Sequence, residues 1–518
     1  MPGGGFLTLV AYGTQNVALS GNPQISYFYK AFKRYTHFAM ETIRVSPDGP
    51  NELRFDQPTQ LRAKIPRQGD LMSDMYFTFQ LPPIFSKYIE PNTVPGRTAQ
   101  YEFQWVRYIG AAIIQNAAFF VGGQKIQEFD GNYLLSRALI DMDQDTFHKW
   151  EQLVGNVPEL TDPAKGLYAG GTTQTAYPTV VKNPALAAGV PQGNRPSIFG
   201  RTIYVPLSFW FTESSSLALP LVGLQYHECQ VQLTLNPIQN LYTILDASGY
   251  RVNPTYAMLA PTQEIALNKP EYASVTDLSG QIRNFLTDIN ETTQLNTWNY
   301  QPNLQITYIY LPDEERNIFA SRPLSYIMNQ ITPYPFQGLY QRQILDMETH
   351  NPITRMIFVQ RRSDAINRND VANFTNWYAY PTAPFQVTPG LPPNLQAICS
   401  GVPVPNAQEE IIRAIRIICN GNEIQEEKPV EFFTRLTPYK YTKGLGQTGL
   451  PVYTFELSRS PTQPSGSINA SRIRNFQVDL DLYPLPTNTT YTYDVVIYVE
   501  NLNWFQIASG MGGLKYAL

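Results

Sequence analysis

Two distant stretches of this sequence align with each other without a gap. Residues 113–128 read IIQNAAFFVGGQKIQE, and residues 411–426 read IIRAIRIICNGNEIQE. Two further pairs of short segments repeat in the same order but at different spacings: 230–237 with 477–484, and 309–311 with 497–499. Because three matches keep one order along the chain, we interpret the protein as two copies of one domain, with insertions between the matched segments.

Alternation of apolar and polar residues is the dominant local pattern. Every second residue from Met75 to Leu81 is apolar, which is the period of a half-buried strand. Helical patterns are few: 132–153 predicts two short helices, and 313–330 predicts a third that is interrupted at Pro323. The sequence therefore predicts an all-β fold of two antiparallel β-sandwiches, with a few short helices in loops.

The first copy carries more chain between its matched segments than the second copy does. One insertion falls near 155–200, where Gly, Pro and Thr are frequent and the composition is typical of a loop. The other falls near 238–302. Since large insertions are tolerated on surfaces and not in cores, we expect both to lie on the outward-facing surface of the first domain.

The composition limits the classes of partner. Only 15% of the residues are charged, whereas the chain has 33 Tyr and 27 Phe, which suits surfaces that become buried against other proteins. The net charge of −4 argues against a general nucleic-acid binder, and we expect no specific nucleic-acid partner. No basic segment precedes the first apolar stretch, and no apolar run reaches the roughly 20 residues of a membrane span, so we expect a soluble protein without an export signal.

Motifs for metal or cofactor chemistry are incomplete. The acidic run at 141–145 imitates the start of a calcium loop, but Thr146 stands where the loop needs Gly and Gln152 where it needs Glu. The glycine-rich segment 444–449 is followed by a strand pattern instead of a helix, so it cannot form a phosphate cradle. We predict no catalytic residue, no cofactor and no metal site.

Three cysteines and several sequons remain as candidate chemical sites. Because an odd and sparse set of cysteines suits a reducing compartment, we predict free thiols at three positions: Cys229, Cys399 and Cys419. Sequons make three asparagines candidates for glycosylation, provided that the modifying enzymes reach the chain: Asn290, Asn373 and Asn488.

Basic and aromatic residues alternate near the N-terminus, in the segment 27–35. Such a segment could stack on nucleic-acid bases or touch anionic lipid. A strand or turn at an assembly contact is the interpretation that we favour.

Five segments resemble the signatures of the major capsid proteins of nucleocytoplasmic large DNA viruses. They cover both halves and both ends of the chain: 21–43 (GNPQISYFYKAFKRYTHFAMETI), 209–228 (FWFTESSSLALPLVGLQYHE), 311–320 (LPDEERNIFA), 464–473 (PSGSINASRI) and 509–516 (SGMGGLKY). The resemblance implies a structural protein and not an enzyme, with two consecutive eight-stranded jelly rolls. It places an N-terminal arm at 1–25, the first jelly roll at 26–311, a linker at 312–322 and the second jelly roll at 323–518.

The resemblance also implies a way of assembling. Three chains would form a homotrimer with a pseudo-sixfold outline, and such capsomers would tile the faces of an icosahedral shell. Assembly would take place in the host cytoplasm over an inner membrane, with neighbouring capsomers, penton proteins and minor capsid proteins as partners.

Two other classes of function use the same kind of fold. A lectin-like β-sandwich could bind glycans through aromatic loops, and a β-sandwich enzyme could hold catalytic residues that are dispersed in the sequence. Assembly distinguishes them, because a capsid protein must associate with itself, whereas a lectin or an enzyme need not.

Overall fold

The structure is a computed structural model. It describes residues 4–11, 13–29, 32–85, 103–161, 163, 196–245, 251–258, 272–274, 280–286, 295–376, 409–485 and 489–516. The chain divides into two units, Met1–Ala39 and Met40–Leu518.

The N-terminal unit contains two short helices, α1 (Gly4–Val10) and α2 (Thr14–Ser20). Every residue of this unit whose exposure is described is exposed, including Tyr27 and Phe28. The aromatic residues of the predicted assembly contact therefore make no core of their own. Lys30, which belongs to the same segment, lies outside the described residues.

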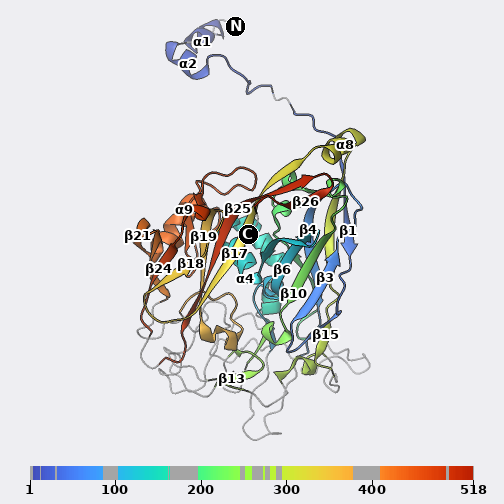
Figure 1. The fold of residues 1–518 in the computed structure, drawn as a ribbon, viewed down its shortest axis with the longest axis vertical. Coiled ribbons are helices and arrows are strands. Elements are labelled where there is room, and N and C mark those ends of the chain that lie inside the picture. The colour runs from blue at the N-terminus through green and yellow to red at the C-terminus, as the bar shows by residue number, and fades with distance from the viewer. Residues whose placement is uncertain are drawn as a thin grey trace. The chain divides into compact units, whose positions relative to one another are not determined.

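Residues 40–311 of the larger unit form its first half, which is built on two sheets (Figure 1). One sheet has the strand order β1 (Ala39–Val45), β16 (Asn303–Tyr310), β4 (Leu71–Leu81) and β8 (Arg201–Pro206), with β9 (Leu219–Pro220) paired to β4. The other has the order β3 (Thr59–Lys64), β10 (Cys229–Leu235), β6 (Ile114–Val121) and β7 (Gln124–Phe129).

Residues from 324 onward form the second half on the same plan. One sheet has the order β17 (Leu324–Leu339), β25 (Tyr493–Ala508), β19 (Pro352–Arg362) and β22 (Val452–Thr454), with β23 (Ile468–Asn469) and β26 (Met511–Leu514) paired at its strands. The other has the order β18 (Gln343–Met347), β24 (Phe476–Leu482), β20 (Ile412–Cys419) and β21 (Asn422–Pro429). Every strand pair whose register is described is antiparallel, such as β10 with β6 and β24 with β20.

The two halves have the same order of strands, which confirms the internal repeat predicted from the sequence. Residues 113–128 span the hairpin of β6 and β7, and residues 411–426 span the equivalent hairpin of β20 and β21. The other two matches also fall on equivalent strands, β10 with β24 and β16 with β25. Each half is therefore one copy of the repeated domain.

The matched hairpins also share their turn. Gly122 and Gly123 connect β6 to β7 with φ of 57° and 85°, and Asn420 and Gly421 connect β20 to β21 with φ of 50° and 80°. Two consecutive residues with positive φ suit the right-handed twist of the flanking strands. This requirement explains why Gly and Asn occupy these positions in both copies.

The two helices predicted within 132–153 are present, whereas the helix predicted over 313–330 is right only up to Ser321, because 324–330 belongs to strand β17. α4 (Gly131–Asp141) and α5 (Gln144–Val154) fall within or beside 132–153, and α8 (Asp313–Ser321) lies between β16 and β17. α4 begins at Asp130, whose side chain accepts a hydrogen bond from the Tyr133 N–H. The shorter helices α3 (Ile109–Ala112), α6 (Pro158–Thr161) and α9 (Thr437–Tyr441) were not predicted. The fold is therefore mostly β, and the all-β prediction is too strict.

The expectation that both insertions lie on the surface is wrong for much of their described part. Within 238–302, β11 (Tyr242–Leu245) pairs with β5 (Phe103–Trp105) and with β12 (Arg251–Val252). Buried side chains from this insertion join the main core: Ile238, Leu241, Tyr242, Ile244, Val252, Ile282, Phe285 and Trp298. The insertion adds its own apolar residues to the core of the sandwich, and the strands of the two main sheets keep their alternating pattern. Most of the insertion at 155–200, residues 164–195, lies outside the described residues.

The larger unit also contains two short strand pairs. β13 (Tyr256–Met258) pairs with β14 (Tyr272–Ser274), and β15 (Thr297–Asn299) pairs with β2 (Glu52–Arg54). Figure 1 places β13 at the end of this unit opposite to β26 and α8. Among the helices that the structure describes, none is long and apolar enough to cross a membrane.

Candidate functional site: the junction between the two halves

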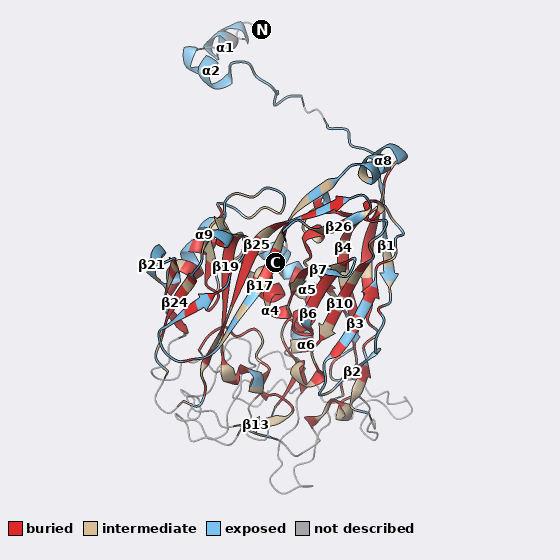
Figure 2. Ribbon diagram, in the orientation of Figure 1, coloured by how far each residue is buried: buried red, intermediate tan, exposed pale blue. Residues whose placement is uncertain are grey.

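The two halves meet across one face of the second half's first sheet. In β19, Met356 and Phe358 point into the core between the two sheets of that half, whereas Ile357 and Val359 join the core of the first half. All four side chains are buried. A sandwich strand normally buries one face only, so burial on both faces marks this sheet as an internal interface (Figure 2).

Arg355 of β19 lies at the centre of this interface and is 1% exposed. Its Nη1 donates to Asp141 Oδ1 at 2.5 Å, and its Nη2 donates to Asp141 Oδ2 at 2.7 Å. Nη2 also donates to Glu500 Oε1 of β25 at 2.7 Å. Because Asp141 ends α4 of the first half, the ion pair joins the two halves.

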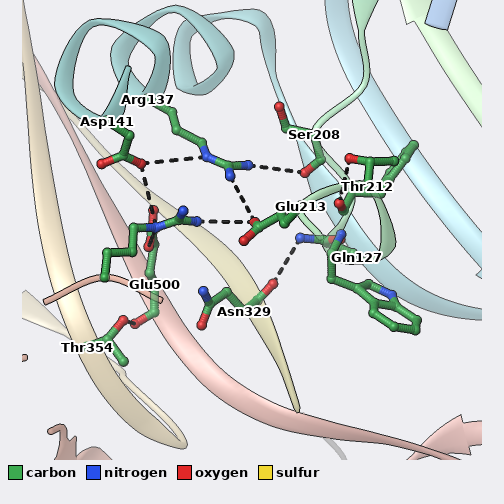
Figure 3. Close-up of polar contacts among 12 residues, drawn as sticks. Gln127, Arg137, Asp141, Ser208, Thr212, Glu213, Asn329, Thr354 and Glu500 are labelled. Carbon is green, nitrogen blue, oxygen red and sulfur yellow. Dashed lines mark hydrogen bonds and ion pairs between the residues drawn. The ribbon is translucent and has the colours of Figure 1, made fainter. Parts of the chain in front are cut away.

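Two further arginines and one glutamate extend these three residues into a charge-balanced cluster of six, which we call the junction cluster: Arg137, Asp141, Glu213, Arg355, Arg459 and Glu500. Arg137 Nη2 lies 2.9 Å from Glu213 Oε1, and Arg459 Nη2 lies 3.1 Å from the same oxygen. Figure 3 shows Arg137 between Asp141 and Glu213, with a further contact to the Ser208 carbonyl. Three positive and three negative groups compensate one another where water is excluded.

The pKa values reflect this compensation. Burial opposes the charge of Asp141, but Arg355, Arg459 and Arg137 outweigh it and hold the pKa of Asp141 well below its usual range. Burial likewise opposes the charge of Glu500, whose pKa the neighbouring arginines also lower. Glu456, at the margin of the cluster, behaves differently, because burial raises its pKa to about 7.

Two tyrosines cross the interface in opposite directions. Tyr133 of α4 donates its hydroxyl to Glu500 Oε1 at 2.7 Å, and Tyr498 of β25 donates its hydroxyl to Asp130 Oδ2 at 2.6 Å. Their ring centroids are 5.6 Å apart. Each half therefore supplies one phenol and accepts the other with a carboxylate.

A pair of glutamines joins the edge strands β7 and β17. Gln127 Nε2 donates to the Asn329 carbonyl at 2.9 Å, a contact that Figure 3 shows, and Gln330 Nε2 donates to the Ile126 carbonyl at 3.0 Å. Gln127 Oε1 also accepts from the Trp210 N–H at 2.9 Å. These side chains satisfy backbone groups at two sheet edges without continuing the sheet from one half to the other.

The C-terminal hairpin also reaches the first half. The Tyr226 N–H donates to the Gly510 carbonyl at 2.9 Å, and His227 Nδ1 lies 2.9 Å from the Gly512 carbonyl oxygen. Two of the recognised signatures, 209–228 and 509–516, thus meet in space. A Cβ on Gly512 would lie 2.5 Å from the Leu224 side chain, which explains why glycine is needed there.

The linker helix α8 is fixed by Asp70. Its Oδ2 accepts from the Leu311 N–H at 2.8 Å, and its Oδ1 lies 3.1 Å from Arg316 Nε. Acidic residues fill the first turn of α8, where the helix dipole favours negative charge. The signature at 311–320 is therefore a structural connection between the halves.

The remaining predicted sites are structural or lie outside the described residues. Asp143 occupies the residue before α5, at the junction between α4 and α5 that the sequence predicted, without a side-chain capping hydrogen bond. In the described ranges, no three His, Cys, Asp or Glu residues are grouped so that they could hold a metal ion. Cys229 and Cys419 are free and buried, and Cys399 lies outside the described residues.

The three glycosylation candidates stay predictions. Asn373 is 2% exposed, and its Nδ2 donates to Asp370 at 3.0 Å. Its burial means that an enzyme could reach it only before the chain folds. Asn290 and Asn488 lie outside the described residues.

Sequence reasoning missed the junction cluster. Its members are far apart along the chain, and charge alone does not reveal them. The available signal was the placement of Arg355 and Glu500 inside long apolar strands, where an isolated charge would be costly.

Two fused β-sandwiches with one strand order and a buried junction define the double jelly-roll class of capsid proteins. Comparison with known protein families agrees. A family described as "Major capsid protein N-terminus" matches residues 26–275, and a family described as "Large eukaryotic DNA virus major capsid protein" matches residues 315–513.

Individual relatives span the full chain. The major capsid protein of Phaeocystis pouchetii virus is 25% identical, with 99% of each chain covered, and that of Paramecium bursaria Chlorella virus 1 is 26% identical, also with 99% of each covered. Among solved structures, a quasi-atomic model of the latter virus's capsid matches with a TM-score of 0.64 at 19% identity, covering 95% of this chain and 100% of that one. The Faustovirus major capsid protein matches with a TM-score of 0.62 at 14% identity, covering 96% and 94%.

The chain belongs to the major capsid proteins of large eukaryotic DNA viruses. It is a structural component of the virion capsid, a role that requires it to associate with copies of itself. The family is structural and non-enzymatic. The junction between the halves is accordingly a scaffold that holds two lobes in a fixed relation.

Proposed function

We propose that three copies of this chain form a homotrimeric capsomer with a pseudo-sixfold outline. The observation that carries the proposal is the common strand order of the two halves, joined by a buried junction. One chain therefore supplies two similar lobes in a fixed relation, and three chains supply six. A threefold assembly of this kind can pack hexagonally although only one gene product is present.

The capsomers tile the flat faces of an icosahedral shell. Their neighbours are further capsomers, with penton proteins at the vertices and minor capsid proteins between them. The shell assembles in the host cytoplasm over an inner membrane. This part of the proposal is supported by the likeness of the chain to proteins that are described as parts of virus capsids.

We propose that each half is an eight-stranded jelly roll, to which the remaining strands, such as β9, β11, β23 and β26, are additions. The domain boundaries that we propose are 1–25 for the arm, 26–311 for the first jelly roll, 312–322 for the linker and 323–518 for the second. The position of α8 between β16 and β17 supports a linker at that point.

Light scattering on the purified full-length protein tests the trimer. We expect a mass three times that of the 58.7 kDa chain, constant over a range of micromolar concentrations. A folded protein that stays at 58.7 kDa across the same range would overturn the proposal.

A further inference from the structure

The two edge strands that meet at the junction each have an equivalent strand in the other half of the chain, and these equivalent strands do not pair with each other within one chain. Within one chain, edge strand β7 of the first half meets edge strand β17 of the second half through the Gln127 and Gln330 hydrogen bonds described above. By strand order, β7 corresponds to β21 and β17 corresponds to β1. The surfaces that remain are therefore β21 on the second half and β1 on the first.

The residues that form the contact on β7 recur on β21. Ile126 and Gln127 are followed by Glu, and Ile424 and Gln425 are followed by Glu in the same places of the repeat. Ile126 is 1% exposed, whereas Ile424 is 40% exposed. Gln425 donates only to the neighbouring Glu426 carbonyl, at 3.2 Å, among the described contacts. The Ile and Gln of this repeat are thus buried in the first half, whereas in the second half the Ile is exposed and the Gln is half-buried.

The matching strand β1 is an open edge. Its residues are exposed or half-buried along its whole length, and Met40 is 59% exposed. Arg44 of β1 is exposed and forms no ion pair with any described residue. An open edge with exposed apolar residues is normally covered in the working assembly.

Both open surfaces carry charged side chains. β21 carries three glutamates and one lysine: Glu423, Glu426, Glu427 and Lys428. β1 carries Arg44, which forms no ion pair among the described contacts, and Glu41, which accepts a hydrogen bond from the Tyr310 hydroxyl at 3.0 Å. Each glutamate of β21 has an ion-pair partner within its own chain, Arg416 for Glu423, Lys428 for Glu426 and Arg342 for Glu427. The match between the two edges therefore rests on the repeated contact residues and on their exposure, and not on opposite net charges.

We propose that β21 of one chain packs against β1 of a second copy, with Ile424 and Gln425 repeating between chains the contact that Ile126 and Gln127 make within the chain. The interface is head-to-tail, because a different surface is used on each partner. A head-to-tail contact forms a closed ring when the rotation between neighbouring subunits divides a full turn evenly. If each lobe is rotated by one sixth of a turn from the next, three two-lobed chains complete the ring. This inference rests on the proposed trimer and names the surfaces that form it.

Replacement of Ile424 by Asp tests the inference, because the side chain is already exposed in the single chain and should not be needed for folding. We expect I424D to weaken the trimer by about tenfold or more in its dissociation constant, measured by light scattering on dilution. The matched control is I344D. Ile344 is 49% exposed on β18, the opposite edge strand of the same sheet, and I344D should stay trimeric.

Crosslinking identifies the partner strand directly. A short bismaleimide should join Gln425→Cys on one chain to Met40→Cys on another and give covalent dimers and trimers in denaturing gels. The pair Gln425→Cys and Lys64→Cys, which places the second cysteine on β3, should not crosslink above the level of the unmodified protein. This measurement does not depend on the folding of I424D.

The outcomes separate this inference from the proposed function. A monomeric unmodified protein contradicts the trimer itself. A trimer that I424D leaves intact, or that I344D disrupts to the same extent, contradicts the assignment of β21 while the trimer stands. Crosslinking of the β3 pair in preference to the β1 pair contradicts the assignment of β1.

Discussion

Arg355 of the second half and Asp141 of the first half form a bidentate ion pair, with N–O distances of 2.5 and 2.7 Å. The pair joins a strand to the end of a helix 214 residues away in sequence. Because Arg355 is buried and the Asp141 side chain is only 17% exposed, neither can exchange its partner for water at low cost. The relation between the two lobes of the chain is therefore fixed by a contact that tolerates little displacement.

Replacement of Arg355 by Met should destabilise the chain strongly. It removes the positive charge that Asp141 and Glu500 share and leaves two carboxylates in a site that excludes water. We expect a loss of about 3–5 kcal/mol in the free energy of unfolding, measured by chemical denaturation.

Lys64 provides the control for this prediction. It pairs with Glu228 at the surface, where the two side chains are 60% and 54% exposed. Lys64→Met should cost at most about 1 kcal/mol. Equal losses of unfolding free energy for R355M and K64M would contradict the conclusion that the buried Arg355 ion pairs stabilise the junction more than a surface pair does.

Stability should fall as the pH rises from about 5 to above 7. Burial raises the pKa of Glu456 from 4.5 to about 7, so the folded chain holds a proton that the unfolded chain releases. The stabilising effect of that proton is present below pH 4.5 and is lost as the pH rises through 7. We expect a change of about 1–3 kcal/mol, followed by urea denaturation at several pH values.

The variant Glu456→Gln isolates this effect. It cannot ionise, so it should be more stable than the unmodified chain above pH 7 and should show a flatter profile between pH 5 and 7. Asp141 and Glu500 change the stability in the opposite direction and at lower pH. Their lowered pKa values stabilise the folded chain at neutral pH, and this stabilisation is lost on acidification. Burial also raises the pKa of Glu410 to about 7, so part of the slope should remain in the variant. A profile that E456Q leaves entirely unchanged would contradict the contribution assigned to Glu456.

The sequence predicted the repeat, most of the regular strands and the helices within 132–153 because these depend on local patterns, but it extended the helix at 313 into residues that form β17. The hairpins at 113–128 and 411–426 keep both their alternation and their turn residues, so the equivalence of the halves was visible before the structure. The junction was not, because Arg355 and Asp141 carry no local pattern that pairs them. The buried role of the insertion at 238–302 was missed since its strands are only two to four residues long, too short for periodicity to be recognised.

The thiols of Cys229 and Cys419 should be unreactive in the folded protein. Burial raises the pKa of Cys229 to about 12 and that of Cys419 to about 11, so almost no thiolate is present at neutral pH. Iodoacetamide should label neither residue in native buffer and both after denaturation, as read by peptide mass spectrometry. Labelling of Cys229 in the native protein within minutes would contradict its placement on the buried face of β10.

Gly510→Ala should destabilise the C-terminal hairpin more than its backbone angle alone requires. Gly510 has φ of +79°, and an added Cβ would lie 2.6 Å from the Tyr226 ring. Gly338 is a matched control, with φ of +74° and no atom within 4 Å of an added Cβ. We expect Gly338→Ala to cost about 1–2 kcal/mol and Gly510→Ala to cost clearly more in thermal unfolding. Similar losses would mean that the exposed Tyr226 ring moves aside for the added Cβ and does not restrict this position.

Electron cryomicroscopy of the purified, full-length protein tests the central claim most directly, because it shows the number of lobes and their arrangement in one measurement. The account predicts a threefold particle with six lobes of similar size and a hexagonal outline, in which β21 of each chain faces β1 of the next. Single two-lobed particles, or a twofold dimer that buries the same surface on both chains, would contradict it.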